Sequence, residues 1–554
     1  MSDVYTHTQY PGGMKATVDP EAFDTVLDLF DQKTKEFADK PAYTCMGQTL
    51  TYADIDRLSG NFAAYLQNET DLQPGDRIAV QLPNILQYPV AVFGALRAGL
   101  IVVNTNPLYT DRELEHQMND SGAKALVVYA GMAAQAIRVQ PKTPVQRIIV
   151  TEIADLHPGL KRVLVNTVVK KVKKMVPAYD TSRVGSFRDA LKRGSSKTYK
   201  RAASGHDDTI ILQYTGGTTG VAKGAMLTNR NLIANMLQCY EFFKLTLKDG
   251  QETFVAPLPL YHIYAFTVNC MTIMLTGNHN VLIPNPRDIP GFVKELGKHR
   301  FTGFAGLNTL FVALMNNEGF KNVDFSALKL TISGGMALTR AAAERWEEVT
   351  GCPISEGYGM TESSPVISFN PAGHQQLGTI GIPAPNTEVR IADDDGKLQG
   401  FDEPGELQVR GPQVMKGYWN RPDDTAKTID EDGFLKTGDI AVLQQDGYLK
   451  IVDRKKDMIV VSGFNVYPNE IEDVLTRHPK VVECAAVGVP SEKTGEAVKV
   501  FVVTNGPVEE KELSDFCRES LTGYKVPKQF VFRDELPKTN VGKVLRRELR
   551  DAEG

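Results

Sequence analysis

The most restrictive feature of this sequence is an alternation, in its first third, between short apolar segments and stretches of helical periodicity. Residues 52–66 and 88–97 carry apolar side chains at helical spacing. Apolar segments of strand length precede or follow them at 78–82, 100–103, 125–129 and 148–150. Strands that are separated by helices pair in parallel, with helices covering both faces of the sheet. The sequence therefore predicts an α/β fold with a doubly wound sheet.

The composition changes twice in the second half of the chain. From about residue 378, Pro, Gly and short alternating segments dominate, which is typical of a small antiparallel sheet or barrel. Further on, the charged run 453–457 separates two apolar segments. A chain of 554 residues also exceeds the usual size of one domain. We therefore expect an N-terminal domain over 1–452, with a β-rich subdomain at about 378–452, and a C-terminal domain over 453–554.

Composition and spacing exclude several classes of protein. The formal net charge of −5 argues against a globally basic nucleic-acid binder. The six cysteines form no CxxC pair and the nine histidines form no cluster, which indicates reduced thiols and no transition-metal site. Residues 1–5 lack the character of a signal peptide, and no apolar run approaches the roughly 18 residues of a spanning helix. We expect a cytoplasmic protein that crosses no membrane.

The sharpest motif is the Gly/Thr-rich segment Tyr214-Thr215-Gly216-Gly217-Thr218-Thr219-Gly220-Val221-Ala222-Lys223-Gly224, which follows the apolar segment 210–212. Glycines let backbone N–H groups turn toward an anion, and threonine hydroxyls add donors. Lys223 supplies a positive charge for a phosphate. The GxxxxGK[ST] pattern does not fit, and an ordinary turn rarely needs this combination of residues. We predict a phosphate-binding loop.

A second Gly-containing segment, 356–363, combines several features that suit a nucleotide. Two glycines flank Tyr358, as if the backbone passed close to a flat ligand stacked on the ring. Thr361 offers a hydroxyl to a phosphate, and Glu362 offers the hard oxygen ligand that Mg²⁺ prefers. Read alone, the segment is equally compatible with a loop that carries one core tyrosine and a solvated glutamate.

Three further segments give weaker evidence for a ligand site. The glycines of 333–338 follow an apolar segment, where ligands bind in parallel sheets, but an ordinary tight turn fits as well. The carboxylate that ends 433–439 could accept both hydroxyls of a ribose, although a hairpin turn is the simpler interpretation. Nothing local makes the lysine that ends 537–543 catalytic.

In this order, the motifs resemble the adenylate-forming superfamily of acyl-CoA synthetases, luciferases and adenylation domains, over nearly the whole chain. Residues 432–440 and 448–472 resemble the fatty-acyl-CoA synthetase version, and with 214–227 the sequence is most similar to bacterial long-chain fatty-acid–CoA ligases. The resemblance implies an N-terminal domain of doubly wound sheets with a small β-barrel subdomain, and a mobile α+β C-terminal domain. It also implies that ATP and a fatty acid give acyl-AMP and pyrophosphate, that CoA then accepts the acyl group with release of AMP, and that Mg²⁺ is required.

The resemblance further implies a role for each motif residue. The β- and γ-phosphates would be held by Thr215, Gly216, Thr218, Thr219 and Lys223. The adenine would be enclosed by Gly335, Gly357 and Tyr358, and the ribose held by Asp439 and Arg454. Thr361 would contact phosphate, and Glu362 would ligate Mg²⁺. Lys543 would bridge the fatty carboxylate and the α-phosphate beside His262. The hinge would lie at Asp453 and Arg454, and Gly463 would face a CoA tunnel.

The pattern of apolar and basic side chains in residues 160–176 predicts an amphipathic helix that is unusually basic. They contain six Lys or Arg and no acid, and Leu164, Val168 and Val172 share one arc of the helix with other apolar residues. Lys170, Lys173 and Lys174 fall mostly on the opposite side, although Lys171 spoils the separation. Such a helix either lies peripherally on an anionic bilayer or covers a sheet with a solvated basic face.

Several alternatives to a long-chain fatty-acid–CoA ligase stay open. A fatty acyl-AMP ligase that loads a carrier protein would carry an insertion near the hinge, and residues 455–467 run on without one. A medium-chain acyl-CoA synthetase differs only in pocket depth, and the apolar residues of 261–276 and 301–314 suit either a pocket or a core. A luciferase-type oxygenase and a non-catalytic nucleotide-binding protein are the remaining classes. A homodimer is common in the family, and no stretch of the sequence points to an interface.

Overall fold

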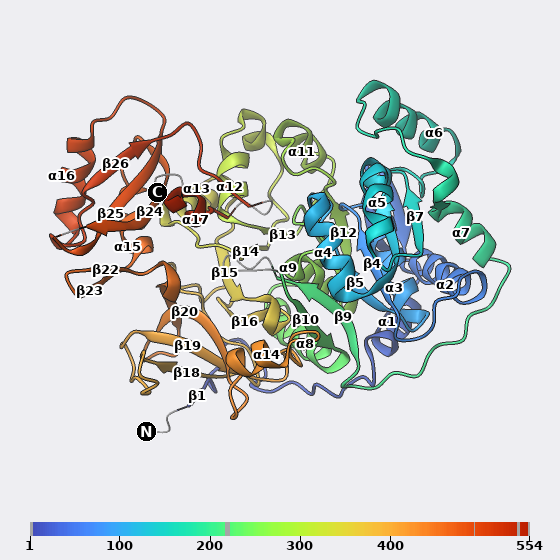
Figure 1. Ribbon diagram of the computed structural model, residues 1–554, viewed down its shortest axis with the longest axis horizontal. Helices are drawn as coiled ribbons and strands as arrows, with labels where there is room; N and C mark the ends of the chain where they lie inside the picture. The colour runs from blue at the N-terminus through green and yellow to red at the C-terminus, as the bar shows by residue number, and fades with distance from the viewer. Residues whose placement is uncertain (1–3, 216–221, 492, 540–542, 552–554) are drawn as a thin grey trace.

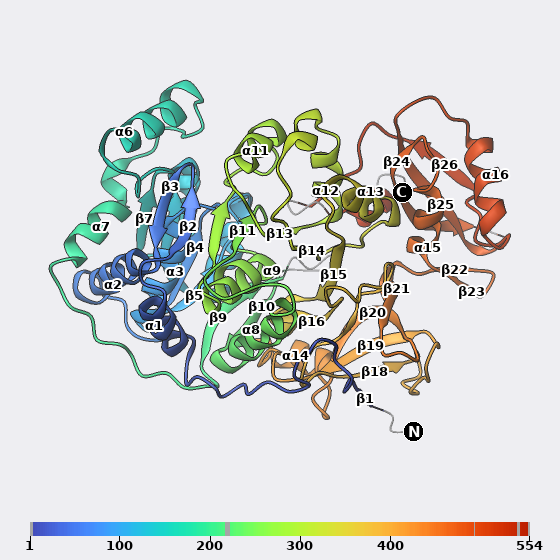
Figure 2. The ribbon, with the colours of Figure 1, turned by 180° about the vertical axis from the view of Figure 1, so that it is seen from behind.

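The computed structural model describes residues 4–215, 222–491, 493–539 and 543–551, and its strands form four sheets. Two large sheets build the body of the molecule, on the right in Figure 1. A small antiparallel sheet lies at the lower left, and a sheet of C-terminal strands lies at the upper left. Figure 2 shows the same arrangement from behind, with helices α1, α2, α3 and α8 in front of the strands.

The first large sheet contains the strands that the alternating pattern predicts. Its order is β10-β9-β5-β4-β6-β7-β8, and every neighbouring pair is parallel except β10 with β9. The strands are β4 (Arg77–Gln81), β5 (Ile101–Asn104), β6 (Ala123–Tyr129), β7 (Arg147–Thr151), β8 (Gly185–Ser186), β9 (Thr209–Tyr214) and β10 (Gly224–Thr228). The predicted doubly wound α/β fold is confirmed.

The second large sheet has nine strands in the order β17-β16-β15-β14-β13-β11-β12-β2-β3, with parallel pairing from β15 to β2. The strands are β2 (Pro41–Cys45), β3 (Gln48–Thr51), β11 (Thr253–Ala256), β12 (His279–Leu282), β13 (Gly303–Gly306), β14 (Leu330–Ser333), β15 (Ile354–Gly359), β16 (Val366–Phe369) and β17 (Ile382–Pro383). Apolar residues from both large sheets belong to one continuous core cluster. Because β14 and β15 are parallel neighbours, the loops that follow their carboxyl ends lie at the same edge of the sheet.

The β-rich segment forms a five-stranded antiparallel sheet in the order β1-β18-β19-β20-β21. The strands are β1 (Tyr5–Thr6), β18 (Glu388–Ala392), β19 (Gly405–Arg410), β20 (Leu435–Leu443) and β21 (Leu449–Arg454). The short strand β1, which no sequence pattern predicts, joins this sheet from the other end of the chain. Further contacts tie the segment to the stretch just before β18: Tyr10 donates a hydrogen bond to the Pro383 carbonyl of β17, in the nine-stranded sheet, at 2.8 Å, and the Val18 N–H donates one to the Asn386 side chain at 2.6 Å.

The C-terminal strands form a sheet of their own, ordered β23-β22-β25-β24, with β26 beside β25. The strands are β22 (Ile459–Val461), β23 (Phe464–Val466), β24 (Val481–Ser491), β25 (Gly495–Thr504) and β26 (Gln529–Phe532). Its buried residues form a cluster separate from the main core. This arrangement matches the expected α+β C-terminal unit, and Asp453 lies on β21 just before it.

Helices cover the sheets and begin where the sequence supplies caps. The predicted helix at 52–66 begins at Tyr52 because Thr51 accepts a hydrogen bond from the Asp54 N–H and the Asp54 carboxylate accepts one from the Thr51 N–H. The helices are α1 (Val26–Glu36), α2 (Tyr52–Glu69), α3 (Gln87–Arg97), α4 (Asp111–Ser121), α5 (Ala133–Val139), α6 (Gly159–Thr167), α7 (Phe187–Gly194), α8 (Asn229–Phe243), α9 (Ile263–Ala265), α10 (Ile273–Leu275), α11 (Ile289–Leu296), α12 (Asn308–Met315), α13 (Arg340–Thr350), α14 (Pro422–Thr428), α15 (Pro468–Leu475), α16 (Glu510–Ser520) and α17 (Arg546–Asp551).

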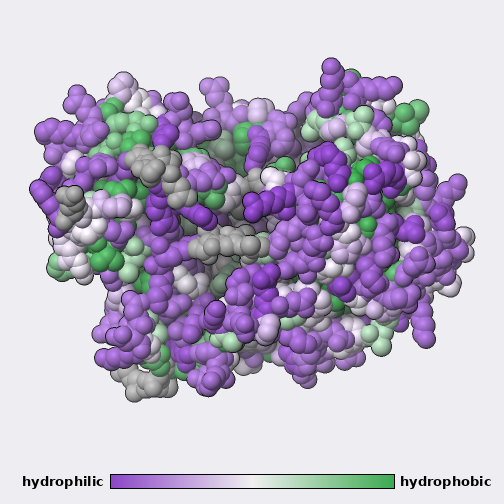
Figure 3. Space-filling view, viewed as in Figure 1, coloured by the Kyte–Doolittle hydropathy of each residue, from purple (hydrophilic) through white to green (hydrophobic). Residues whose placement is uncertain are grey.

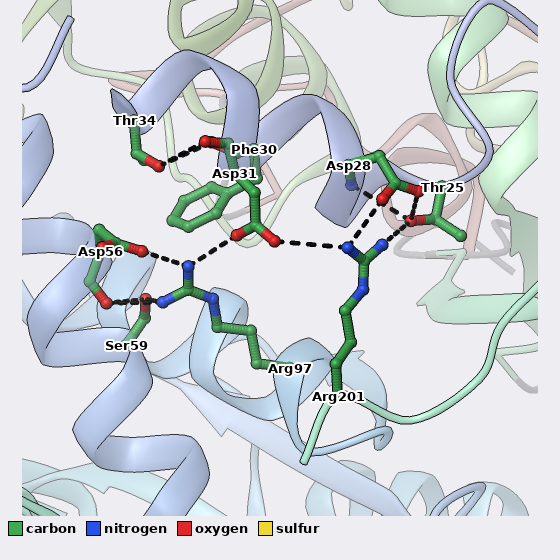
Figure 4. Close-up of polar contacts among 9 residues, drawn as sticks. All are labelled: Thr25, Asp28, Phe30, Asp31, Thr34, Asp56, Ser59, Arg97 and Arg201. Atoms are coloured by element: carbon green, nitrogen blue, oxygen red, sulfur yellow. Dashed lines mark hydrogen bonds and ion pairs between the residues drawn. The ribbon is translucent and has the colours of Figure 1, made fainter. Parts of the chain in front are cut away.

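A buried ionic network joins α1, α2 and α3 to the segment that follows α7 (Figure 4). Arg97, at the end of α3, is only 4% exposed and forms ion pairs with Asp31, at 2.7 Å, and with Asp56. Arg201 forms ion pairs with Asp28 at 2.7 Å and with the other oxygen of Asp31 at 3.3 Å. Each charge in the network is therefore compensated, which a buried guanidinium requires.

Helix α6 has no buried residue. It projects at the upper right of Figure 1 and continues as a π-helical turn, Val168–Val172. Across the residues that the structure describes, no helix combines the length and the hydropathy needed to cross a bilayer.

Candidate active site

One cavity of about 2710 Å³ brings together most of the predicted site residues. It lies where the carboxyl ends of β14 and β15, the paired strands β20 and β21, and the C-terminal residues meet. The predicted residues that line it are Thr215, Lys223, His262, Gly335, Gly357, Tyr358, Thr361, Glu362, Asp439, Arg454 and Lys543. Gly216, Thr218 and Thr219 lie outside the described residues.

The phosphate loop begins and ends as a hairpin between β9 and β10. The Thr215 N–H donates to the Lys223 carbonyl at 3.0 Å, which closes the base of the loop. The ammonium of Lys223 lies 3.1 Å from the Asp424 carboxylate and 5.1 Å from the ring centre of Tyr418. Lys223 is therefore held at the cavity wall by an acid and an aromatic face, which leaves its remaining donors for an anion.

Backbone glycines shape the wall on which we expect the adenine. Gly335 has φ +83°, a conformation that L side chains rarely adopt. A Cβ on Gly357 would lie 2.6 Å from the Phe369 ring, so only glycine fits there without movement. The hydroxyl of Tyr358, next in the chain, donates to the Asp439 carboxylate. Burial raises the pKa of Tyr358, and the neighbouring Asp439 raises it further, so the phenol stays neutral.

Asp439 and Arg454 face each other across the β20–β21 ladder. They form a register pair, and the guanidinium Nε lies 3.5 Å from the Asp439 carboxylate. One strand pair therefore places an acceptor and a donor side by side at the cavity, where the hydroxyls of a ribose could bind both.

Lys543 reaches the same cavity from the C-terminal unit. Burial, followed by the positive charge of Arg454, lowers its pKa from the ordinary 10.5 to about 8, while Asp439 and Glu362 oppose the shift. No neighbouring residue in the sequence marks this lysine as functional, yet in the fold it lies half-buried near the charged groups of the site. At pH 7 the Lys543 side chain is still largely protonated. Its positive charge is screened less by water than that of a fully exposed lysine.

His262 lies beside this lysine at the start of α9. Its Nδ1 accepts a hydrogen bond from the Tyr264 N–H at 3.3 Å, so the ring caps the helix. Burial, with a further contribution from Lys543, lowers the pKa of His262 to about 4. The imidazole is therefore neutral near pH 7, and because Nδ1 accepts, the proton is on Nε2.

Two predicted residues lie away from the cavity lining. Asp453 is fully buried, its carboxylate accepts hydrogen bonds from the Arg454 and Asn469 N–H groups at 2.7 and 2.8 Å, and burial raises its pKa to about 6. Gly463 occupies the turn between β22 and β23 with φ +83°, and a Cβ there would meet nothing within 4 Å. The hinge and tunnel roles stay predictions.

Several residues that line the cavity carry no recognisable signal in the sequence. Glu356 and Tyr418 are buried and line the cavity. The Glu356 carboxyl accepts a hydrogen bond from the Leu338 N–H at 3.1 Å, and burial raises its pKa to about 8. The apolar part of the wall also uses residues outside the two segments considered, namely Cys239, Phe242 and Phe243 of α8 and Val366 and Phe369 of β16. No local pattern marks these positions, because α8 and β16 look like ordinary core elements.

The donor set suits Mg²⁺ better than a metal held by protein alone. The described residues contain no group of three or more His, Cys, Asp or Glu side chains that could hold a metal ion. Mg²⁺ typically takes one or two carboxylates and completes its shell with substrate phosphates and water. Glu362 meets that need, since it lines the cavity, lies near Lys223, and has its Oε1 oriented by the Tyr418 hydroxyl at 2.6 Å.

Comparisons with known proteins agree with this geometry. Residues 30–419 match the AMP-binding enzyme family, and residues 470–543 match the AMP-binding enzyme C-terminal domain. The chain is 53% identical to a long-chain-fatty-acid–CoA ligase of Escherichia coli O157:H7, over 98% of this chain and 97% of that protein. It is 38% identical to the long-chain-fatty-acid–CoA ligase of Bacillus subtilis, over 96% and 94% of the two chains.

Solved structures share the fold. A crystal structure of ATP-bound MatB from Rhodopseudomonas palustris superposes with a TM-score of 0.82 at 28% identity, over 95% of this chain and 99% of that one. An anthranilate CoA ligase in complex with anthranoyl-AMP gives a TM-score of 0.85 at 23% identity, over 97% and 99% of the chains, which shows the fold alone. Both the sequence matches and the shared architecture lead to one conclusion: this chain is a member of the AMP-binding enzyme family.

Proposed function

We propose that this protein is an ATP-dependent, AMP-forming long-chain fatty-acid–CoA ligase. The observation that carries the proposal is the half-buried position of Lys543, which lines one cavity with Glu362, Lys223 and the Asp439–Arg454 pair. Relatives that are 52–53% identical over nearly their full length are named long-chain-fatty-acid–CoA ligases. The cavity wall near His262 is apolar, as a fatty chain requires.

The residues of the cavity suit formation of an acyl adenylate. A carboxylate is a poor electrophile, so it is activated by attack on the α-phosphorus of ATP, with pyrophosphate as the leaving group. Two anions must then approach each other, and the cation of Lys543 lies where it can bind both the carboxylate and an α-phosphate oxygen. In a buried cavity such a preorganised charge stabilises the transition state more strongly than it would in water. His262, neutral with Nε2 protonated, offers a hydrogen bond to the fatty carboxylate.

The other residues hold the nucleotide in place for this attack. Lys223 faces the outer phosphates, the glycines at 335 and 357 allow the adenine to lie flat against the backbone, and Asp439 with Arg454 holds the ribose. Thr361 offers its hydroxyl to a phosphate. Glu362 would be the protein ligand of Mg²⁺, which when bound would offset negative charge on the phosphates. Positioning of this kind accounts for much of the catalysis of phosphoryl and nucleotidyl transfer.

For the second half-reaction we propose that the C-terminal unit turns about Asp453 and that the thiol of CoA passes Gly463. The space next to Gly463 is open, which supports a path for the thiol. A side chain at this position would project into that path. Gly463→Leu should then slow thioester formation from supplied acyl-AMP and leave ATP–pyrophosphate exchange close to normal. Normal thioester formation by a folded variant would remove the tunnel role.

The proposal is tested by ATP–pyrophosphate exchange across fatty acids from acetate to oleate, with and without CoA. Exchange that rises to a maximum with long chains, and acyl-CoA that accumulates only when CoA is present, is the expected result. A maximum at medium length would make the protein a medium-chain synthetase. Acyl-AMP that passes to a carrier protein but not to CoA would make it an acyl-AMP ligase. ATP binding without exchange would leave only a nucleotide-binding role.

We also propose that α6 and the π-helical turn dock on an anionic membrane, where long-chain fatty acids partition. Only Val169 of the predicted apolar arc is buried, while Leu164, Val172 and Met175 are 65%, 71% and 51% exposed. Outside that arc, Leu160 is 89% exposed. In Figure 3, apolar side chains lie among hydrophilic ones at the upper right, over α6. The alternative, in which the arc packs on a sheet, does not explain this exposure.

Vesicle binding tests the membrane proposal. Each Lys near an anionic surface contributes roughly 1 kcal/mol, so a quadruple change to Glu should weaken binding to phosphatidylserine vesicles at least 100-fold. The positions are Lys170, Lys171, Lys173 and Lys174, which are all exposed. The matched control changes four exposed lysines elsewhere to Glu, namely Lys35, Lys248, Lys321 and Lys397. Equal loss of binding in both variants would reject the assignment. A homodimer, expected from the resemblance, is a separate proposal that sedimentation analysis tests.

A further inference from the structure

Tyr418 contacts two groups of the site that come from different parts of the chain. Its hydroxyl donates to Oε1 of Glu362 at 2.6 Å. The face of its ring lies 5.1 Å from the ammonium of Lys223. Glu362 belongs to the loop after β15 and Lys223 ends the phosphate loop before β10, so one side chain spans both.

The backbone fixes Tyr418 against both elements. The Trp419 N–H donates to the Gly224 carbonyl at 2.8 Å and the Met226 N–H donates to the Gly417 carbonyl at 2.9 Å, so the segment runs as an added bridge beside β10. The Met415 N–H donates to the Glu362 carbonyl at 2.8 Å. Tyr418 is 8% exposed, and its own N–H donates to the Thr425 hydroxyl at 2.9 Å. Its ring therefore has little freedom to move.

The ion pair between Lys223 and Asp424 completes this arrangement. Asp424 lies in α14, which begins four residues after Tyr418, and its carboxylate is 3.1 Å from Lys223. The segment 418–424 thus contacts both groups. Tyr418 contacts Glu362 and Lys223, and Asp424 forms an ion pair with Lys223. A direct ion pair between Glu362 and Lys223 would engage the carboxylate that Mg²⁺ needs, whereas the ion pair with Asp424 leaves Glu362 free of Lys223 and leaves Lys223 its remaining donors.

We propose that Tyr418 is a positioning residue that keeps Glu362 and Lys223 apart and aims both at the phosphates of the same nucleotide. The inference rests on the proposed function, because it assigns the two groups to ATP and Mg²⁺. The hydroxyl occupies one oxygen of Glu362 and leaves the other for the cation. The ring face adds a cation–π attraction that, together with the Asp424 carboxylate, fixes the position of the Lys223 ammonium.

Two substitutions separate the roles of the hydroxyl and of the ring. Tyr418→Phe removes only the hydrogen bond to Glu362, and Tyr418→Leu also removes the aromatic face. Calorimetric titration with ATP, in a series of Mg²⁺ concentrations and in EDTA, measures the binding of each variant without reference to turnover. ATP–pyrophosphate exchange with a long-chain fatty acid is recorded in parallel. The control is Tyr448→Phe, whose hydroxyl donates to the His374 carbonyl at 2.6 Å and does not line the cavity.

Tyr418→Phe should raise the Mg²⁺ concentration needed for half-maximal tightening of ATP binding roughly 10-fold, because a hydrogen bond to a charged group is lost. Its ATP affinity in EDTA should stay within about twofold of the wild type. Tyr418→Leu should also lose about two- to fivefold in EDTA. An unchanged Mg²⁺ dependence in Tyr418→Phe would overturn the proposal. So would an equal loss with and without Mg²⁺, which would indicate packing alone. Wild-type protein that binds Mg·ATP but exchanges no pyrophosphate would count against the proposed function instead.

Discussion

Replacing Lys543 with Ala removes a half-buried cation that the C-terminal unit places in the active-site cavity near Asp439, Glu362 and Arg454. Loss of a single preorganised donor to a developing anion costs roughly 3–4 kcal/mol, so adenylation should slow about 10²–10³-fold. Thioester formation from supplied acyl-AMP needs no attack on the α-phosphorus and should fall less than about threefold.

The pH dependence gives this prediction a second measurement. Because the pKa of Lys543 is about 8 in the protein without ligands, the protonated fraction falls tenfold per pH unit above that value. The kcat/KM of adenylation should therefore decline along an alkaline limb that begins near pH 8. Lys543→Arg keeps the positive charge at high pH, and it should lose part of the rate but also lose the limb.

The assay is ATP–pyrophosphate exchange from pH 6.5 to 9.5, compared with acyl-CoA formation from acyl-AMP. The matched control is Lys528→Ala, which removes an exposed lysine of the same unit outside the cavity lining. The reasoning is refuted if folded Lys543→Ala loses both half-reactions equally, or if the alkaline limb is the same in Lys543→Arg as in the wild type.

Three further predictions concern stability and the nucleotide. The pKa of Glu356 is raised from 4.5 to about 8, so the contribution of this group to the free energy of unfolding should be unchanged below pH 4.5 and fall by up to roughly 5 kcal/mol as the pH rises from 4.5 through 8; Glu356→Gln should remove this component of the slope in thermal melts between pH 5 and 8.5. Arg97→Met should lower the free energy of unfolding by roughly 2 kcal/mol in urea titrations, because its hydrogen bonds to the part-exposed carboxylates of Asp31 and Asp56 are lost while Asp31 keeps Arg201; no measurable loss would contradict this. Gly357→Ala should raise the KM for ATP several-fold with a smaller change in kcat, since its methyl group meets the Phe369 ring at 2.6 Å; an unchanged KM would show that the wall yields freely.

The sequence predicts the fold well wherever one period dominates a segment. Helix α2 begins at Tyr52 as expected, since both the apolar spacing and the cap at Thr51 are local. The pairing of β1 with β18 could not be predicted, because a two-residue strand carries no periodicity and its partner is far away in the chain. The sequence predicts helix α6 but not the exposure of its apolar side. That exposure depends on the packing of other elements, which no local pattern indicates.

The same distinction applies to the active-site cavity. The Gly/Thr-rich motif and the Tyr358–Glu362 segment are recognisable because glycine, hydroxyl and carboxylate residues cluster within a few positions. Lys543 gains a role only through the resemblance, since its place among Asp439 and Glu362 is a tertiary fact. Glu356 and Tyr418 were missed because a single acid or tyrosine next to glycine is common, and only burial and contacts distinguish them.

The tie between the first residues and the β-rich sheet sets an order for folding during synthesis. Tyr10 binds the Pro383 carbonyl, which emerges from the ribosome 373 residues later. At about 5–20 residues per second, the segment 5–18 waits roughly 20 to 75 s for its partner strands. During that time Tyr5 and Tyr10 stay without their native contacts, while the body of the molecule that lies between the two partners in the chain can already form. The segment therefore joins its partners only after much of the body has been synthesised, although before the C-terminal strands β22 to β26 are made, and changes to it should affect the yield of folded protein more than the chemistry of the cavity.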